Sequence, residues 1–331
     1  MRVMRTRGDT LVDWLRATGE PTRLRVLALL AREELAVIEI GRILQQSQPR
    51  VSRHLKLLTE AGLVERFQDG AWVFHRLSAA EPVRGFLDGV LDLLDTDVDP
   101  YAADRHSLDQ VRGERGEQAA AYFARNAAHW DEIRSLHVDE AEVEAAILRA
   151  SGPGPFRRLV DLGTGAGRML TLLGPSSEHA VGLDLSQSML NIARGEVTKA
   201  GLEARCELRH GDIFATGLPG GCADLVVIHR VLHYLADPAK ALEEAGRLLR
   251  PGGRLLVVDF APHALEQLRD QHQHRRLGFS DEEMARALTG AGLDPEPPVA
   301  LPPAKAGGLT VEIWSARAAA APALQTERTA A

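Results

Sequence analysis

Residues 159–184 hold the feature that most constrains the fold: two apolar segments joined by a glycine loop, the second of which ends in an acid. The first segment, Leu159–Leu162, leads into Gly163, Gly165 and Gly167, and the second ends at Asp184. Glycines at such a turn allow left-handed backbone and close approach to a bound group. Their spacing differs from the Gly-x-Gly-x-x-Gly of dinucleotide folds, because the third glycine comes one residue early. The pattern predicts a strand–loop–helix–strand unit with an adenosine site that is not a nicotinamide site.

The glycine spacing and the segments after it resemble class I S-adenosylmethionine (SAM) methyltransferases. Any one segment alone suits an ordinary strand-to-helix turn, but the ordered set favours the family. The resemblance covers residues 156–317 and rests on five segments, which are 159–168, 182–185, Leu208–Ile213, Ala223–His229 and Leu249–Asp259.

This resemblance implies a Rossmann-like α/β domain with a central seven-stranded sheet. Asp184 would bind both ribose hydroxyls, since a carboxylate accepts through two oxygens. Asp212 would accept from the adenine amino group, and Ile213 would cover the ring. The implied ligand is SAM or S-adenosylhomocysteine (SAH), and the implied cofactor-binding residues are Asp161, Gly163, Gly165, Gly167, Asp184, Leu185, Met189, Asp212, Ile213, His229 and Tyr122.

Charge is distributed unevenly along the 331 residues, whose net charge is −7. Residues 1–78 hold 13 Lys and Arg against 9 Asp and Glu, whereas the remainder holds 26 against 37. A basic end indicates nucleic acid as a partner. Cys206 and Cys222 form no ligand pair or disulfide framework, which suits a reducing compartment. No apolar run reaches the ~18 residues of a membrane span, so we expect a cytoplasmic protein.

The basic segment predicts a winged helix-turn-helix (α+β). Helical periodicity runs through Thr22–Leu30 and Ile38–Leu44, and a further helix starts after Ser47 with Pro49 in its first turn. Its apolar residues would face inward, leaving an outward set for DNA: Gln48, Arg50, Ser52, Arg53, His54 and Lys56. The alternation over residues 62–77 around Asp69-Gly70 predicts a hairpin wing, whose candidate phosphate contacts are Arg66, Gln68, His75 and Arg76.

Residues 10–95 resemble an ArsR/SmtB-type repressor domain, through Pro21–Leu27, Val51–Leu58 and Ala61–Val64. In that family the flanking helices dimerise. Here they would be Leu11–Ala17 and Glu81–Leu94, and the expected assembly is a homodimer on double-stranded operator DNA. The family's metal sensors carry cysteines before the recognition helix, and this chain has none there, so no metal is predicted.

These patterns divide the chain into four parts. We predict a DNA-binding and dimerisation domain at 1–95, a linker that becomes a helix at 96–118, a SAM-binding domain at 119–317 and a disordered tail at 318–331, within an alanine-rich end that starts at Ala316. Residues 119–131 resemble the helix before the SAM fold of ubiquinone and menaquinone methyltransferases. Its aromatic side chains, Tyr122, Phe123 and Trp130, either close the pocket or pack on the sheet.

Candidate bases for methyl transfer follow the fourth and fifth strands: His229, His233, Asp259 and His263. His229 and His233 would share one face if residues 230–235 were helical. That spacing also suits a metal, but no acid or thiol accompanies it at ligand spacing. The motif of DNA amino-methyltransferases and the several cysteines of arsenite methyltransferases are missing. Two hypotheses remain for this domain: a small-molecule C- or O-methyltransferase, or a ligand pocket retained for sensing.

The order of the two domains resembles SAH-responsive repressors of the methionine cycle. Our leading hypothesis is therefore a DNA-binding transcriptional regulator, a repressor, with SAM or SAH as effector. The alternative is an active small-molecule methyltransferase with an autoregulatory DNA-binding domain. A third hypothesis, an inactive platform, is disfavoured by the intact acids Asp161, Asp184 and Asp212.

Overall fold

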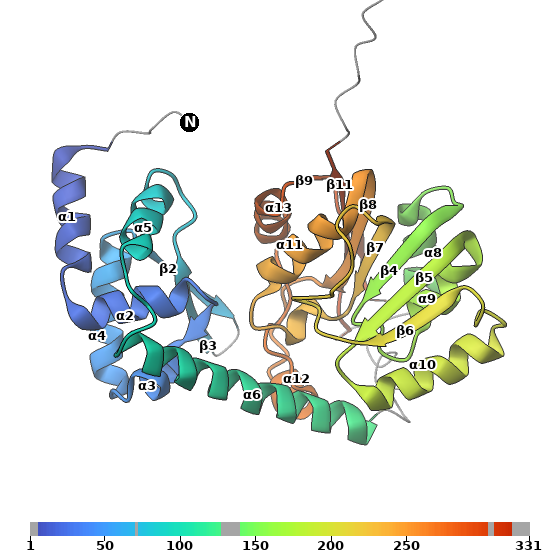
Figure 1. Ribbon diagram of the computed structural model, residues 1–331, viewed down its shortest axis with the longest axis horizontal. Helices are drawn as coiled ribbons and strands as arrows, with labels where there is room; N and C mark the ends of the chain where they lie inside the picture. Colours follow the sequence, from blue (N-terminus) through green and yellow to red (C-terminus); the bar gives the residue numbers. More distant parts are fainter. Residues whose placement is uncertain (1–5, 70–71, 127–139, 304–307, 320–331) are drawn as a thin grey trace, which may run out of the picture. The chain divides into compact units, whose positions relative to one another are not determined.

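The computed structural model describes residues 6–69, 72–126, 140–303 and 308–319, with side chains left out for 115–126 and 270. The chain divides into two compact units, residues 1–119 and 120–331, which are considered one at a time (Figure 1). Within the described residues, no helix is both long and apolar enough to cross a membrane.

The N-terminal unit is a helical bundle with a small antiparallel sheet (Figure 1). Glu20 caps the second helix by accepting from the backbone N–H of Arg23 at 2.9 Å, and Pro21 occupies its first turn. Gln45, with φ 54°, ends the helix Val37–Leu44 in a left-handed conformation. The recognition helix, Gln48–Glu60, follows it. The elements are α1 Gly8–Thr18, α2 Pro21–Leu30, β1 Leu35–Ala36, α3 Val37–Leu44, α4 Gln48–Glu60, β2 Val64–Asp69, β3 Trp72–Leu77, α5 Val83–Asp92 and α6 Tyr101–Asn126.

The predicted winged helix-turn-helix is confirmed. Val51, Leu55 and Leu58 of α4 are at most 1% exposed and pack in one core with residues of α2 and α3. The wing pairs β2 with β3, and β1 adds a third strand in the order β1-β3-β2.

The first half of α6 belongs to the core of this unit. Leu108 and Val111 lie within residues 96–118, a segment that we expected to be a polar linker, and they are 0% and 6% exposed. Asp104 binds Arg25 of α2 through two hydrogen bonds of 2.6 and 2.7 Å. Although residues 96–118 are mostly polar, they include apolar residues that pack in the core and hold the helix in place.

The C-terminal unit has a mixed sheet covered by helices on both faces (Figure 1). The strand order is β10-β11-β8-β7-β4-β5-β6, with β9 also paired to β11. Its elements are α8 Glu140–Ser151, β4 Phe156–Leu162, α9 Arg168–Leu173, η2 Gly174–Ser176, β5 Ser177–Asp184, α10 Gln187–Lys199, β6 Cys206–His210, β7 Ala223–His229, η3 Leu232–Tyr234, α11 Pro238–Leu248, β8 Leu249–Phe260, α12 Gln267–His272, α13 Asp281–Gly290, β9 Leu293–Pro295, β10 Val299–Leu301 and β11 Val311–Ala318.

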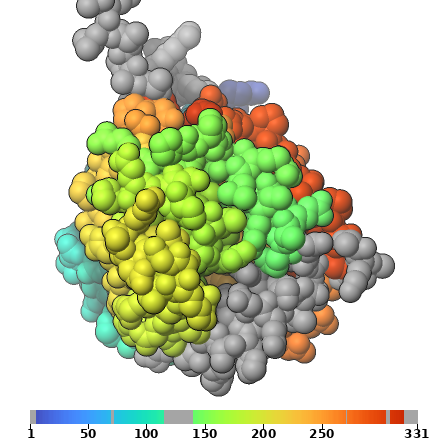
Figure 2. Space-filling model, turned by 90° about the vertical axis from the view of Figure 1, so that its right-hand side faces the viewer, coloured from blue at the N-terminus to red at the C-terminus, as the bar shows by residue number. Residues whose placement is uncertain are grey.

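Two apolar clusters sandwich this sheet. One joins α11 and α13 to one face, and the other joins α8 and α9 to the opposite face. On the side shown in Figure 2, residues 140–210, coloured green to yellow, form one continuous surface. The central strands β4, β5, β7 and β8 run parallel, so their carboxyl ends meet at one edge, where ligands of open α/β sheets bind.

The Rossmann-like class is confirmed, with one strand more than the seven expected. The additional strand is β9, which pairs with the end of β11 between Ala316 and Ala318. The same pairing corrects the expected end of the domain. Strand β11 runs to Ala318 with Ala316 0% exposed, whereas we expected the disordered tail to begin at residue 318 within the alanine-rich end. Residues 320–331 lie outside the described part.

Candidate functional site

The glycine loop between β4 and α9 adopts the backbone that its sequence requires. Gly163, Gly165 and Gly167 have φ values of 77°, 52° and 84°, a region in which other residues are strained. A Cβ atom on Gly163 would lie 2.4 Å from Cγ2 of Val231. The loop therefore packs directly against the segment that follows β7, and Gly163 cannot be replaced without moving Val231.

Asp161 lies beneath this loop at the end of β4 and is 1% exposed. Burial raises the pKa of Asp161 to about 7, a hydrogen bond from Thr164 opposes that rise, and the charge of Asp184 adds to it. The Thr164 hydroxyl donates to Oδ2 at 2.6 Å, while Oδ1 has no hydrogen-bond partner among the described residues. A buried carboxyl oxygen without a partner is suited to a cationic group of a ligand.

Asp184 joins the end of β5 to the glycine loop. Its Oδ2 accepts from the N–H of Gly165 and its Oδ1 from the N–H of Ser186, both at 2.8 Å. Each oxygen keeps a further lone pair for a ligand hydroxyl. Burial raises the pKa of this carboxyl, while the two backbone hydrogen bonds lower it. Ser186 also caps α10 through the N–H of Met189 at 3.3 Å.

The expected adenine end of the site follows β6. Asp212 is exposed, and its Oδ1 accepts from the N–H of Phe214 at 2.9 Å. Ile213, which we expected to cover a ring, is 6% exposed and packs in the core beside α11. Leu185, in contrast, is 59% exposed next to Asp184, and Met189 is buried.

Aromatic side chains expected to close the site cannot be placed. Tyr122 and Phe123 belong to α6, but their side chains lie outside the described residues, as does the whole of Trp130.

The condition under which His229 and His233 would share a helical face is not met. Arg230 has φ 55°, and only Leu232–Tyr234 form a short 3-10 turn, so no α-helix joins the two histidines. His229 ends β7 at the carboxyl edge. His233 is 1% exposed, and its Nδ1 lies 2.6 Å from Oδ1 of Asp259. No group of three potential metal ligands occurs within the described ranges.

The outward face of α4 carries most of the predicted DNA contacts. Ser47 occupies the N-cap position, but its side chain makes no capping hydrogen bond. The exposed residues of the predicted set are Gln48, Arg50, Ser52, Arg53 and Lys56.

His54 differs from that set. Its side chain is 14% exposed, and Nδ1 lies 3.4 Å from Oε2 of Glu20, the residue that caps α2. Burial lowers the pKa of His54, and Glu20 opposes that shift. His54 is therefore turned toward α2 rather than outward.

The wing offers fewer free cations than expected. Arg66 on β2 is exposed, whereas Arg76 binds Glu65 at 3.0 Å and Glu34 at 3.4 Å. His75 is 3% exposed, and burial together with the charge of Arg66 lowers its pKa to about 4. His75 is thus neutral and inside, because its register position on β3 faces the core.

Comparisons with known proteins agree with both units. The Methyltransferase domain family matches residues 160–257, and the family Bacterial regulatory protein, arsR family, matches residues 20–66. A demethylmenaquinone methyltransferase of Thermus thermophilus is 40% identical over 32% of this chain and 48% of its own length. A 27-O-demethylrifamycin SV methyltransferase of Amycolatopsis mediterranei is 29% identical over 59% of this chain and 72% of its own length.

Among solved structures, one chain from the complex of the Haloferax volcanii Trm112 methyltransferase activator with a methyltransferase shares the fold. It has a TM-score of 0.50 and 22% identity, over 60% of this chain and 97% of that chain. The chain thus contains an ArsR-family regulatory region followed by a methyltransferase domain. It spans only about half the length of several relatives, including 48% of the Thermus enzyme.

Sequence reasoning missed the groups that hold the site residues in place. Thr164, Ser186 and Arg230 each make a hydrogen bond or ion pair that supports the carboxyl edge. Thr164 lies in the glycine loop, three residues after Asp161. This short separation in sequence was the signal that could have suggested its hydrogen bond to Asp161. Arg230 binds Glu140, 90 residues away, for which local sequence holds no signal.

Proposed function

We propose that this chain is a transcriptional repressor whose methyltransferase domain binds SAM or SAH as its effector. The observation that carries the proposal is the presence, on one chain, of an exposed basic recognition helix and an intact ligand loop. Arg50 and Arg53 are exposed on α4, and Gly163 has the left-handed backbone required at the loop. We also propose a cytoplasmic location, because operator DNA is the proposed partner.

The site suits an adenosyl ligand that carries an amino acid end. The two oxygens of Asp184 are positioned to accept ribose hydroxyls, and Oδ1 of Asp161 is available to the ammonium group. A bound methyl sulfonium would supply the methyl group for any transfer. The protein residues would bind and orient the ligand.

Regulation would follow from linkage. A ligand that favours one conformation of the repressor changes operator affinity by no more than its own preference for that conformation, typically about 1–3 kcal/mol. SAM and SAH differ in charge and by one methyl group, so either could be the favoured effector.

The test is fluorescence anisotropy on labelled DNA from upstream of the gene, at fixed salt, without ligand, with SAM and with SAH. We expect one ligand to change the DNA affinity at least tenfold, about 1.4 kcal/mol. Asp184→Ala should remove the ligand response and leave ligand-free DNA binding intact. Glu178→Ala, exposed near the opposite end of β5, is the matched control. DNA binding that is tight but indifferent to both ligands would contradict the proposal.

The second candidate is an active small-molecule methyltransferase with an autoregulatory DNA-binding domain. The relatives from Thermus and Amycolatopsis, which are named as methyltransferases, favour it. His229, at the carboxyl edge beside the expected ligand, is the candidate base. SAH formation from SAM with quinol or phenol acceptors, reduced in His229→Ala, would support this function.

We further propose that the chain dimerises through α1 and α5. Leu11, Val12 and Leu15 of α1 are 39%, 44% and 53% exposed, and Leu93 after α5 is 88% exposed. Part of the apolar surface of α5 already packs within the unit, because Leu87 is 0% exposed in its core. The remaining face is suited to a second copy, which would place two recognition helices ~34 Å apart on an inverted repeat.

A further inference from the structure

The segment after β8, residues 261–280, folds back on the carboxyl edge of the sheet. We call it the post-β8 loop. Its two ends are joined by hydrogen bonds from Phe279 N to Phe260 O at 2.9 Å and from His263 N to Leu277 O at 3.0 Å. Gly278 has φ 93°, and a Cβ there would lie 2.2 Å from Ala261 O. The closed base of this loop therefore requires glycine.

The tip of the post-β8 loop, residues 274–276, contacts His233 of η3 through each of its three residues. The backbone N–H groups of Arg275 and Arg276 donate to His233 O at 2.8 and 3.0 Å. The ring of His274 lies 4.1 Å from the ring of His233, measured between centroids. His274 is 8% exposed, and its burial lowers the pKa, which keeps the ring neutral and able to pack.

Asp259 of β8 holds His233 in place through two hydrogen bonds. Its Oδ1 lies 2.6 Å from His233 Nδ1, and its Oδ2 accepts from the His233 backbone N–H at 3.3 Å. Asp259 itself is 0% exposed at the end of β8. One carboxyl group thus holds both the ring and the backbone of His233, and this arrangement sets the ring orientation.

The surroundings of His233 suit positioning better than proton transfer. Tyr234 lies 4.1 Å away between ring centroids, Phe260 lies 5.2 Å away, and the side chain is 2% exposed. A general base must come within hydrogen-bond reach of the proton that it takes. A ring that is covered by three neighbours and bonded to Asp259 does not meet a ligand in this arrangement.

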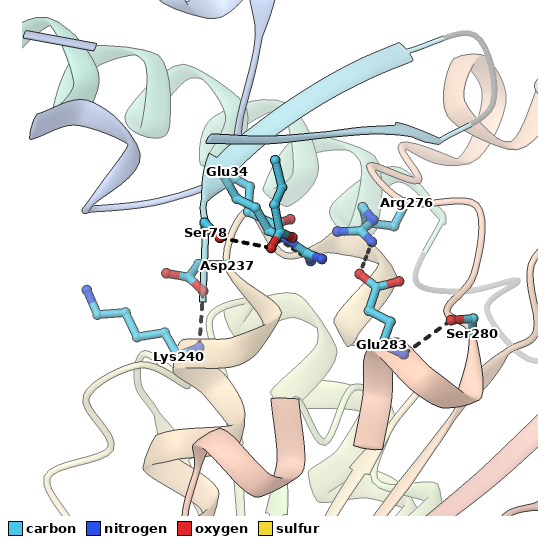
Figure 3. Close-up of polar contacts among 9 residues, drawn as sticks. Glu34, Ser78, Asp237, Lys240, Arg276, Ser280 and Glu283 are labelled. Carbon is cyan, nitrogen blue, oxygen red and sulfur yellow. Dashed lines mark hydrogen bonds and ion pairs between the residues drawn. The ribbon is translucent and has the colours of Figure 1, made fainter. Parts of the chain in front are cut away.

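Two further contacts connect this cluster to the rest of the site. Val231, two residues before His233, packs on Gly163 of the glycine loop. At the tip, Arg276 also forms an ion pair with Glu283 of α13, whose N–H donates to Ser280 Oγ at 3.2 Å (Figure 3). The tip of the post-β8 loop is therefore held by both η3 and α13, and Val231 connects the start of η3 to the glycine loop.

We propose that His233 is a positioning residue that holds the post-β8 loop closed over the carboxyl edge and keeps Val231 against the glycine loop. This inference rests on the proposed ligand site and assigns the post-β8 loop as a wall of that site. It separates the two histidines by role, since His229 lies at the strand end and His233 acts through its neighbours.

The first measurement is hydrogen–deuterium exchange of the full-length protein without ligand. In His233→Leu, peptides that contain Arg275 and Arg276 should exchange at least tenfold faster than in wild type. His233→Asn should restore most of the protection, because its side-chain amide can replace the Nδ1 donor to Asp259. The control is His179→Leu, since His179 is exposed near the start of β5. Wild-type protection in His233→Leu would overturn the inference.

The second measurement is calorimetric titration with SAH. We expect His233→Leu to weaken binding at least fivefold and His233→Asn to recover it. His274→Ala removes the ring contact and leaves the Asp259 pair, so it should release the tip and weaken SAH similarly even if His233→Leu folds poorly. Weakened SAH binding with a protected loop would instead place His233 in direct contact with ligand. If wild type binds neither SAM nor SAH, the proposed function fails, while the ligand-free exchange experiment still decides the role of His233.

Discussion

At the residue scale, folding changes the acid–base chemistry of Asp161 in the glycine loop region of the site. Burial moves the pKa of its carboxyl from 3.8 to about 7. The folded state therefore holds a proton that the unfolded state releases between these values. The resulting stability is fully present below pH 3.8 and is lost as the pH rises through 7.

The pH dependence of ligand binding should have the opposite sign to that of stability. An ammonium group beside Oδ1 favours the ionised form of Asp161, so SAH affinity should increase about tenfold between pH 6 and pH 8. Calorimetric titration across this range measures the effect. Asp161→Asn should bind more weakly and lose the pH dependence, whereas Glu178→Ala should keep it. If the SAH affinity of Asp161→Asn increased with pH as much as that of wild type, another titrating group would be responsible.

His54 and Arg76 show why single side chains in the DNA-binding unit were misplaced. Helical spacing put His54 in the outward set, but its ring turns toward Glu20. Strand alternation left Arg76 outside, but Glu34 and Glu65 neutralise it. Both partners come from other elements, so periodicity within one element could not reveal them.

At the scale of elements, α6 shows how a polar sequence can conceal a structural helix. Asp104, Leu108 and Val111 follow helical spacing; Asp104 contacts Arg25 of α2, and the two apolar residues pack in the core of the unit. Arg112 adds an ion pair with Glu33 at 2.6 Å. The surrounding charges dominated the sequence pattern, so only the packing shows where the N-terminal unit ends.

Loss of the Arg25–Asp104 pair should loosen this helix. The side chains of Arg25 and Asp104 are 20% and 5% exposed, so the pair is intermediate between a surface pair and a fully buried one. A surface pair contributes about 1 kcal/mol, and disruption of a buried pair costs about 3–5 kcal/mol. We expect Asp104→Ala to lower the unfolding free energy by roughly 2 kcal/mol in urea denaturation. Hydrogen exchange should locate the change in residues 101–112.

Asp97→Ala serves as the control for this helix. It removes the Arg105–Asp97 pair, in which Asp97 is 82% exposed, and should change stability little. Equal effects of the two substitutions would mean that the Arg25–Asp104 pair has no special role in holding α6.

At the scale of the whole molecule, the proposed dimer rests on the exposed apolar residues of α1. Leu15→Glu places a charge at the centre of the proposed interface, and burying it unpaired is costly. Sedimentation velocity should show a dimer for wild type and a monomer for this variant, with weaker DNA binding. Leu148→Glu, 45% exposed on α8, is the control and should remain dimeric. A wild-type monomer would exclude the proposed interface.

The sequence by itself determined the two units, the winged helix, the parallel core of the sheet and the left-handed glycines at Gly163, Gly165 and Gly167. These features depend on local periodicity and on backbone conformations that few residues can adopt. The tertiary structure alone decided the pairing of His233 with Asp259, the burial of Ile213 and the packing of Leu108. Each of these depends on residues distant in the chain, whose contacts form only when the elements pack.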